Sequence, residues 1–183
     1  MKKPWIAFFS QTGAEIADLA EKLGRWPDMI VTNRRPAHLR TIDSRVLRSG
    51  CLYECSNNPT EPQYRGILNT YEEPIITLHG WLRIIPPTIC KDYSIFNGHP
   101  GLITKYPELK GKDPQVRAYE GIKVGLYKEA GTVIHKVTEG VDEGKVLAVE
   151  KFNAENINLD ELFQTLRDRS LYLWVQLLTK AIN

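Results

Sequence analysis

Hydrophobic positions along the chain follow two patterns, short unbroken runs and stretches with a helical period. The segment from Trp5 to Ser10 is a continuous apolar run, which predicts a buried strand. From Gly13 onward the apolar residues fall on one face of a helix, and Gly24 is a typical helix end. A second short apolar run covers residues 28–32. This order of strand, helix and strand predicts a parallel α/β sheet.

The middle of the chain contains one clear strand pattern and several weaker ones. Residues 74–80 form the most regular apolar run, and residues 93–96 predict a further strand. Between residues 33 and 73 we expect only a short helix near residues 42–47, a strand at 51–53 and a helix through Ile67 and Leu68. Asp113 followed by Pro114 predicts the start of a helix that stops at Gly121.

The last third of the chain predicts two paired strands and a long helix. Residues 131–137 are rich in Thr, Val and Ile, which favours a strand, and residues 146–149 are its expected partner. From Asn158 to Ile182 the pattern is that of an amphipathic helix, and Asn158 with Glu161 has the spacing of a capping box. Its apolar face contains Leu159, Leu162, Phe163, Leu166, Leu173, Trp174, Leu177 and Ala181. We expect one domain over residues 1–183.

Composition narrows the class of protein without naming a function. The 183 residues are 42% hydrophobic and 25% charged, as is usual for a globular chain, and a net charge of +2 predicts neither nucleic acid nor an acidic partner. No apolar run approaches the length of a membrane span, and the start of the chain lacks a signal-peptide core, so we expect no membrane contact and a cytoplasmic location. The three cysteines lack metal-ligand spacing, which predicts reduced thiols and no metal site.

The candidate chemistry lies in residues 97–142, where an amide, an imidazole and a carboxylate each stand beside a turn-forming residue. Asn97 has an amide that donates to an oxygen becoming negative, and His99 has an imidazole that donates or moves a proton. Asp142 has a carboxylate that orients such an imidazole. No serine or cysteine nucleophile accompanies them, so the trio predicts direct transfer to a substrate nucleophile.

Four ordered sequence blocks also carry a resemblance to a known family. The blocks are Asn97-x-His99-Pro100-Gly101-Leu102, Tyr106-Pro107, Gly131-Thr132-Val133-Ile134-His135 and Gly140-Val141-Asp142-Glu143-Gly144. They resemble the core of the folate-dependent formyltransferases, which include glycinamide ribonucleotide transformylase, the catalytic domain of methionyl-tRNA formyltransferase and sugar-amine N-formyltransferases. The resemblance implies a Rossmann-like α/β fold, an open and mostly parallel sheet with flanking helices and a long carboxyl-terminal helix.

Residue roles follow from this resemblance. Asn97 and a protonated His99 would bind the oxyanion of a tetrahedral intermediate, and Asp142 would raise the pKa of His99 and help to move a proton. His135 is assigned to structure. The formyl donor would be 10-formyltetrahydrofolate, a cosubstrate. The residues expected to bind it are Trp81, Leu82, Arg83, Ile84 and Ile85, in a segment that resembles the family's pterin-binding backbone, and Thr138, Glu139, Gly140 and Val141.

The turn at residues 10–15 decides which amine is expected as acceptor. Thr12, Gly13 and Ala14 would bind a substrate phosphate through backbone N–H groups. Glycinamide ribonucleotide transformylases usually carry a more glycine-rich turn here, and Glu15 would repel a phosphate. Glycinamide ribonucleotide is the favoured acceptor, and a nucleotide-linked amino sugar or another amine is the alternative. Methionyl-tRNA is disfavoured because the chain lacks a strong basic stripe.

Two further alternatives stay open at this point. A formyltetrahydrofolate hydrolase would use the same trio with water in place of the amine, and a folate-binding protein without turnover would keep only the fold. The expected partners are therefore small molecules, a folate and an amine, with a homodimer possible.

Overall fold

The computed structural model describes residues 2–34 and 40–182, and its strands form a seven-stranded sheet in the order β3-β2-β1-β4-β5-β6-β7. The pairs β1 with β2, β1 with β4 and β2 with β3 are parallel, whereas β6 and β7 are antiparallel. This confirms the expected Rossmann-like, mostly parallel sheet. The strands are β1 Trp5–Phe9, β2 Met29–Thr32, β3 Leu52–Glu54, β4 Ile75–Leu78, β5 Ile95–His99, β6 Glu129–Lys136 and β7 Val146–Asn153.

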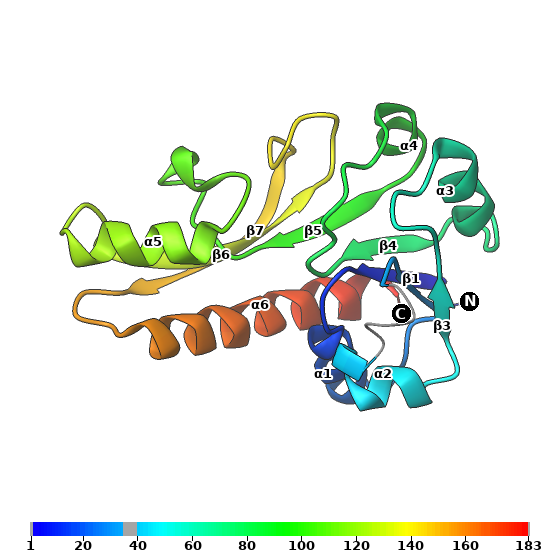
Figure 1. Ribbon diagram of the computed structural model, residues 1–183, viewed down its shortest axis with the longest axis horizontal. Helices are drawn as coiled ribbons and strands as arrows, with labels where there is room; N and C mark the ends of the chain where they lie inside the picture. Colours follow the sequence, from blue (N-terminus) through cyan, green and yellow to red (C-terminus); the bar gives the residue numbers. More distant parts are fainter. Residues whose placement is uncertain (1, 35–39, 183) are drawn as a thin grey trace. The chain divides into compact units, whose positions relative to one another are not determined.

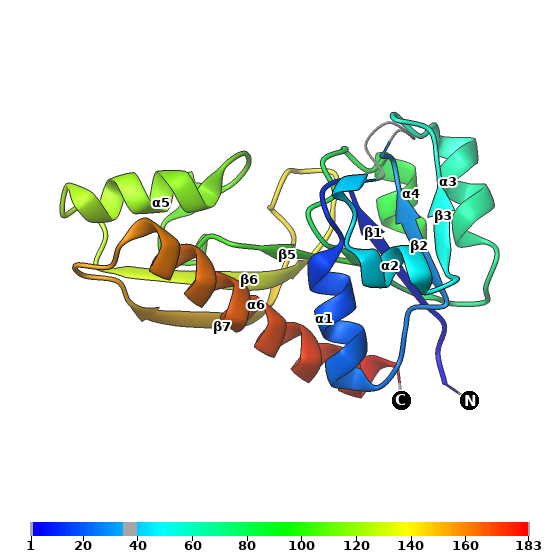
Figure 2. The ribbon, with the colours of Figure 1, turned by 60° about the horizontal axis from the view of Figure 1, so that its bottom comes forward.

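The chain divides into two compact units, Met1–Phe96 with Val175–Asn183, and Asn97–Trp174. A single domain over residues 1–183 stays a prediction. In the first unit α1 and α2 lie on one side of β1 to β4, and α3 and α4 lie on the other (Figures 1 and 2). All of β1 is buried, as its unbroken apolar run predicts. The helices are α1 Ala14–Leu23, α2 Ser44–Arg48, α3 Glu61–Leu68 and α4 Pro87–Asp92.

Local signals explain which of these helices could be foreseen. Gly24 ends α1 in a left-handed conformation, with a φ of 61°, and its N–H donates to the carbonyls of Ala20 and Glu21. The helix α4 was not predicted. It begins at Pro87, directly after Pro86. Proline is compatible with the first helical position, but two consecutive prolines suggest a break in regular structure.

The second unit contains the β6–β7 hairpin, α5 (Pro114–Lys123), the 3-10 turn η2 (Pro107–Leu109) and the first part of α6 (Leu159–Ala181). In Figure 2, α5 lies above the hairpin and this part of α6 crosses it. Leu109, Ala118, Val133, Leu162 and Leu166 share one buried core, so η2, α5, β6 and α6 pack together.

The predicted end of α5 at Gly121 is wrong, because the helix continues to Lys123. A Cβ at Gly121 would lie 2.3 Å from the ring of Tyr127. Gly121 therefore allows the Tyr127 ring to pack against α5, and it does not mark the end of this helix.

The capping box at the start of α6 is confirmed. Glu161 N–H donates to Asn158 Oδ1 at 2.9 Å, and Asn158 N–H donates to Glu161 Oε2 at 3.3 Å. Leu162 and Leu166 are buried, but Leu159 and Phe163 are 39% and 36% exposed, so the buried face is narrower than the sequence predicts. None of the helices in the described part of the chain has both the length and the apolar character of a membrane span.

Candidate active site

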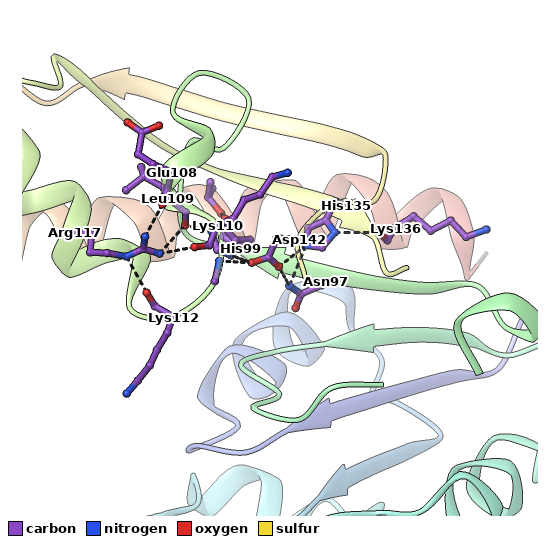
Figure 3. Close-up of polar contacts among 12 residues, drawn as sticks. Asn97, His99, Glu108, Leu109, Lys110, Lys112, Arg117, His135, Lys136 and Asp142 are labelled. Atoms are coloured by element: carbon purple, nitrogen blue, oxygen red, sulfur yellow. Dashed lines mark hydrogen bonds and ion pairs between the residues drawn. The ribbon is translucent and has the colours of Figure 1, made fainter. Parts of the chain in front are cut away.

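The three predicted polar side chains meet in the second unit (Figure 3). Asn97 and His99 lie at the carboxyl end of β5, and Asp142 lies in the connection between β6 and β7. Asp142 Oδ2 is 3.2 Å from His99 Nδ1, and Asn97 Nδ2 donates to Asp142 Oδ1 at 3.4 Å. The spacing in the sequence thus brings an amide, an imidazole and a carboxylate into contact. Their catalytic role stays a prediction.

The backbone around Asp142 is tightly constrained. Asp142 itself is in the left-handed region, with a φ of 53°, which aspartate tolerates better than most residues. A Cβ at Gly144 would lie 1.6 Å from the carbonyl oxygen of Lys136, so only glycine allows the chain to return there. The Asp142 side chain is 9% exposed, and Gly111 N–H donates to its Oδ2 at 2.8 Å.

Four neighbours contact the Asp142 carboxylate and determine its charge. Burial alone would raise the pKa of Asp142, but hydrogen bonding to His135, the nearby charge of His99 and the N–H of Gly111 outweigh burial. The pKa of Asp142 is therefore below its ordinary value, and the group is a carboxylate at neutral pH.

His99 is buried and both of its ring nitrogens face acceptors. Nε2 lies 3.0 Å from the carbonyl oxygen of Leu109, which only accepts, so Nε2 carries a hydrogen. Burial lowers the pKa of His99, and the opposing effects of Asp142 and the Leu109 carbonyl do not offset it. Asp142 thus raises the pKa of His99, as expected, but burial outweighs this effect and the net pKa lies below its ordinary value.

His135 is a fourth polar side chain at this site, although the sequence assigned it to structure. Its Nε2 is 3.1 Å from Asn97 Nδ2 and 3.2 Å from Asp142 Oδ1. Its Nδ1 donates to the Lys136 carbonyl at 3.0 Å, so both ring nitrogens have polar partners. The sequence signal that could have identified His135 is its place at the end of the strand that leads into the Asp142 connection.

A register shift between β6 and β7 falls directly at His135. Ile134 pairs with Ala148, but His135 pairs with Val146, so the register skips Leu147. Such bulges bend a strand and redirect side chains.

The predicted donor-binding segment lies in the first unit, directly after β4. Leu82 and Ile84 are 60% and 69% exposed, whereas Trp81 and Ile85 are buried. Arg83 donates from Nε to the Asn57 carbonyl and from Nη2 to Asn57 Oδ1, both at 2.7 Å. Two exposed apolar side chains fit contact with a flat ring system such as a pterin. The binding roles of Trp81 to Ile85 stay predictions.

The predicted phosphate turn lies beside this segment, in the same unit. Ser10 N–H donates to the Gly80 carbonyl at 3.2 Å, and Leu82 N–H donates to Ser10 Oγ at 3.0 Å. Gly13 is left-handed, with a φ of 72°, and Ala14 N–H donates to Thr12 Oγ1 at 3.3 Å. These two segments meet where β1 and β4 end, the usual ligand position of such sheets.

Glu15 and His79 form a polar contact at this same turn. Glu15 Oε2 is 2.8 Å from His79 Nδ1, and His79 Nε2 is 2.9 Å from Thr77 Oγ1. Trp5 Nε1 donates to that hydroxyl at 2.8 Å. His79 therefore links the first turn of α1 to the buried sheet, a role that its position at a strand end did not reveal.

The remaining predicted donor-binding residues precede Asp142 in the second unit. Thr138, Glu139 and Val141 have exposed side chains, and a Cβ at Gly140 would lie 2.2 Å from Glu143 Oε2. Their contacts with a folate stay predictions. Among residues 2–34 and 40–182, no three His, Cys, Asp or Glu side chains are arranged to hold a metal ion.

Comparison with known proteins shows which family this fold and this polar cluster belong to. Residues 37–182 match the family described as formyl transferase, and the chain belongs to that family. Phosphoribosylglycinamide formyltransferase of Dictyostelium discoideum is 32% identical over 116 residues, 57% of this chain and 55% of that protein. Its counterpart in Bacillus subtilis is 32% identical over 104 residues, 56% of this chain and 48% of that protein. The chain matches about half the length of these relatives.

Solved structures show the same fold over nearly the whole chain. Phosphoribosylglycinamide formyltransferase from Campylobacter jejuni aligns with a TM-score of 0.79 at 20% identity, over 99% of this chain and 98% of that one. Glycinamide ribonucleotide transformylase 1 from Geobacillus kaustophilus aligns with a TM-score of 0.78 at 24% identity, over the full length of both chains.

Proposed function

We propose that this protein transfers a formyl group from 10-formyltetrahydrofolate to a primary amine, with glycinamide ribonucleotide as the favoured acceptor. The observation that supports this proposal is the buried Asp142 carboxylate, which contacts both His99 Nδ1 and Asn97 Nδ2. A family with this chemistry needs a group that accepts a proton and a donor for an oxyanion.

The amine nitrogen would attack the formyl carbon, so that a C–N bond forms and the carbonyl electron pair moves to oxygen. Asn97 would donate from Nδ2 to this oxyanion by giving up its 3.4 Å contact with Asp142, the longer of its two contacts, and His135 would keep the amide oriented. One such donor lowers the barrier by about 3 kcal/mol.

His99 would carry the proton between the two nitrogen atoms of the reaction. Because Nε2 donates to the Leu109 carbonyl, the amine proton would pass to the contacting pair of His99 Nδ1 and Asp142 Oδ2. Asp142, 3.2 Å away, would stabilise the imidazolium that forms. The intermediate would then collapse, the bond from carbon to the folate nitrogen would break, and Nδ1 would return the proton to that nitrogen.

The choice of acceptor follows from the names of the relatives and from the turn at residues 12–14. The relatives from Dictyostelium and Bacillus are both named phosphoribosylglycinamide formyltransferases, which favours glycinamide ribonucleotide. The carboxylate of Glu15 in the first turn of α1 favours a second candidate, an amine acceptor without a phosphate at this turn.

An absorbance assay for the deformylated folate tests both candidates. We expect turnover of a 10-formyl folate that requires glycinamide ribonucleotide, with a reaction lacking acceptor as the control. Turnover with nucleotide-linked amino sugars but without glycinamide ribonucleotide would favour the second candidate. Formate release without any acceptor would indicate a hydrolase and contradict the proposal, as would binding of the folate without turnover across the amine panel.

A further inference from the structure

The Arg117 side chain binds backbone carbonyls of residues 108–113, a loop that comprises the end of η2 and the connection to α5. Its Nε donates to the Lys112 carbonyl at 2.9 Å, and its Nη1 donates to the Glu108 carbonyl at 2.5 Å. Its Nη2 donates to the carbonyls of Leu109 at 3.2 Å and Lys110 at 2.7 Å. Four carbonyls of one short loop therefore converge on one guanidinium (Figure 3). The planar fork of arginine matches this arrangement, and the single ammonium of lysine does not.

The loop held in this way contacts the reactive pair through its backbone. The Leu109 carbonyl accepts from His99 Nε2 at 3.0 Å, and Gly111 N–H donates to Asp142 Oδ2 at 2.8 Å. The loop has little regular structure of its own, and both Gly111 and Asp113 have left-handed φ values. The backbone path of this loop is not determined by a regular element. The contacts with the Arg117 side chain therefore hold the loop in place.

One carbonyl joins the guanidinium to the imidazole. The Leu109 oxygen accepts from both Arg117 Nη2 and His99 Nε2, so its position keeps a hydrogen on Nε2 and orients the ring. With Nε2 fixed in this way, Nδ1 lies against Asp142 Oδ2 at 3.2 Å. Beside burial, which is the larger cause, the charge of Arg117 also lowers the pKa of His99.

We propose that Arg117 is a positioning residue for His99, which acts by holding the Leu109 carbonyl against Nε2 and so keeps the ring oriented with Nδ1 against Asp142. Its effect on turnover rests on the proposed formyl transfer, but its effect on the ring of His99 does not. Arg117 does not touch the reacting atoms in this account.

The test uses two variants of the full chain and a matched control. Arg117→Lys keeps the charge but loses the fork, and Arg117→Met removes both. Arg169→Met is the control, because Arg169 lies in the same unit and its Nη1 contacts Glu150 Oε2 at 3.0 Å, away from the loop. Circular dichroism checks that each variant is folded.

The first measurement is nitrogen NMR of histidine-labelled protein without substrate, at about pH 8 where an ordinary imidazole is neutral. His99→Gln identifies the His99 signals. We expect the Nε2–H tautomer in the wild type and in Arg169→Met, and a mixture of both tautomers in the two Arg117 variants. A folded Arg117→Met protein with the wild-type tautomer would overturn the proposal.

The second measurement is steady-state formyl transfer with the same proteins. We expect kcat to fall about tenfold to a hundredfold in both Arg117 variants, with little change in KM, because a misplaced catalytic group slows the reaction without weakening binding. Added guanidinium ion should restore part of the rate of Arg117→Met. Unchanged kcat in both variants would overturn the link to catalysis. A wild type without turnover but with the expected tautomer change would refute the proposed function and keep the inference about His99.

Discussion

The packing of Gly101 against His99 allows the position of the imidazole to be tested by adding one methyl group. A Cβ at Gly101 would lie 2.8 Å from His99 Nε2 and 3.1 Å from Pro114 Cβ. The ring is held at both nitrogens, so it does not yield freely. Pro114 blocks movement of the new methyl group away from His99. We therefore expect Gly101→Ala mainly to displace the His99 ring.

The size of that displacement sets the expected effect on rate. Restoring an ordinary contact of 3.4 Å moves the ring by about 0.6 Å, and since a shift of about 1 Å costs about a hundredfold in rate, we expect kcat to fall roughly tenfold. The same shift lengthens the contact from Nε2 to the Leu109 carbonyl, now 3.0 Å, beyond an ordinary hydrogen bond. Overpacking should also lower the free energy of unfolding by about 1–3 kcal/mol.

Formyl transfer and urea unfolding of Gly101→Ala measure the two effects separately. Gly66→Ala is the matched control, because Gly66 lies inside α3 with no atom within 4 Å of an added Cβ. This control should keep the wild-type rate and gain about 0.5–1 kcal/mol in stability. A Gly101→Ala protein with full turnover and unchanged His99 NMR signals would refute the reasoning.

Three other predictions concern charge, pH and the α6 cap. Asp142→Asn keeps a residue that tolerates the left-handed backbone but removes the carboxylate, so kcat should fall about a hundredfold or more while circular dichroism stays the same. Because the pKa of His99 is lowered from 6.5, the unfolded chain binds its proton more readily, and acidification below pH 6.5 should destabilise the wild type more than His99→Gln in urea titrations. The lowered pKa of Asp142 adds a loss of stability below pH 3.8. Asn158→Ala removes the acceptor for Glu161 N–H and should cost about 1 kcal/mol in thermal or urea unfolding, and an unchanged midpoint would show that the cap does not contribute.

The strands and the first helix could be predicted because their signals are local. The apolar run of β1 and the glycine after α1 act within a few residues, and the structure has both where the pattern places them. Two other local signals were misleading. Gly121 lacks a side chain because of Tyr127, six residues away, and consecutive prolines concealed the start of α4.

The trio of Asn97, His99 and Asp142 could be predicted because each residue stands in a recognisable block. The state of His99 could not, because its pKa depends on burial and on the Leu109 carbonyl, which only the folded chain brings together. Arg117 was overlooked for a related reason. It acts on backbone carbonyls, and no residue type in a sequence marks which carbonyl an arginine will bind.

The skipped residue in the β6–β7 register divides one strand into parts with different tolerance to change. Up to Ile134, β6 pairs regularly and its buried apolar side chains, Ala130, Val133 and Ile134, serve the core, so substitutions of these three should be tolerated or rejected according to volume. After the skip the strand presents His135 to polar partners, where the arrangement of donors and acceptors sets the limit. A library that varies residues 129–136 together would therefore select for side-chain volume at some positions and for hydrogen bonding at others. The boundary between the two kinds of position falls between Ile134 and His135.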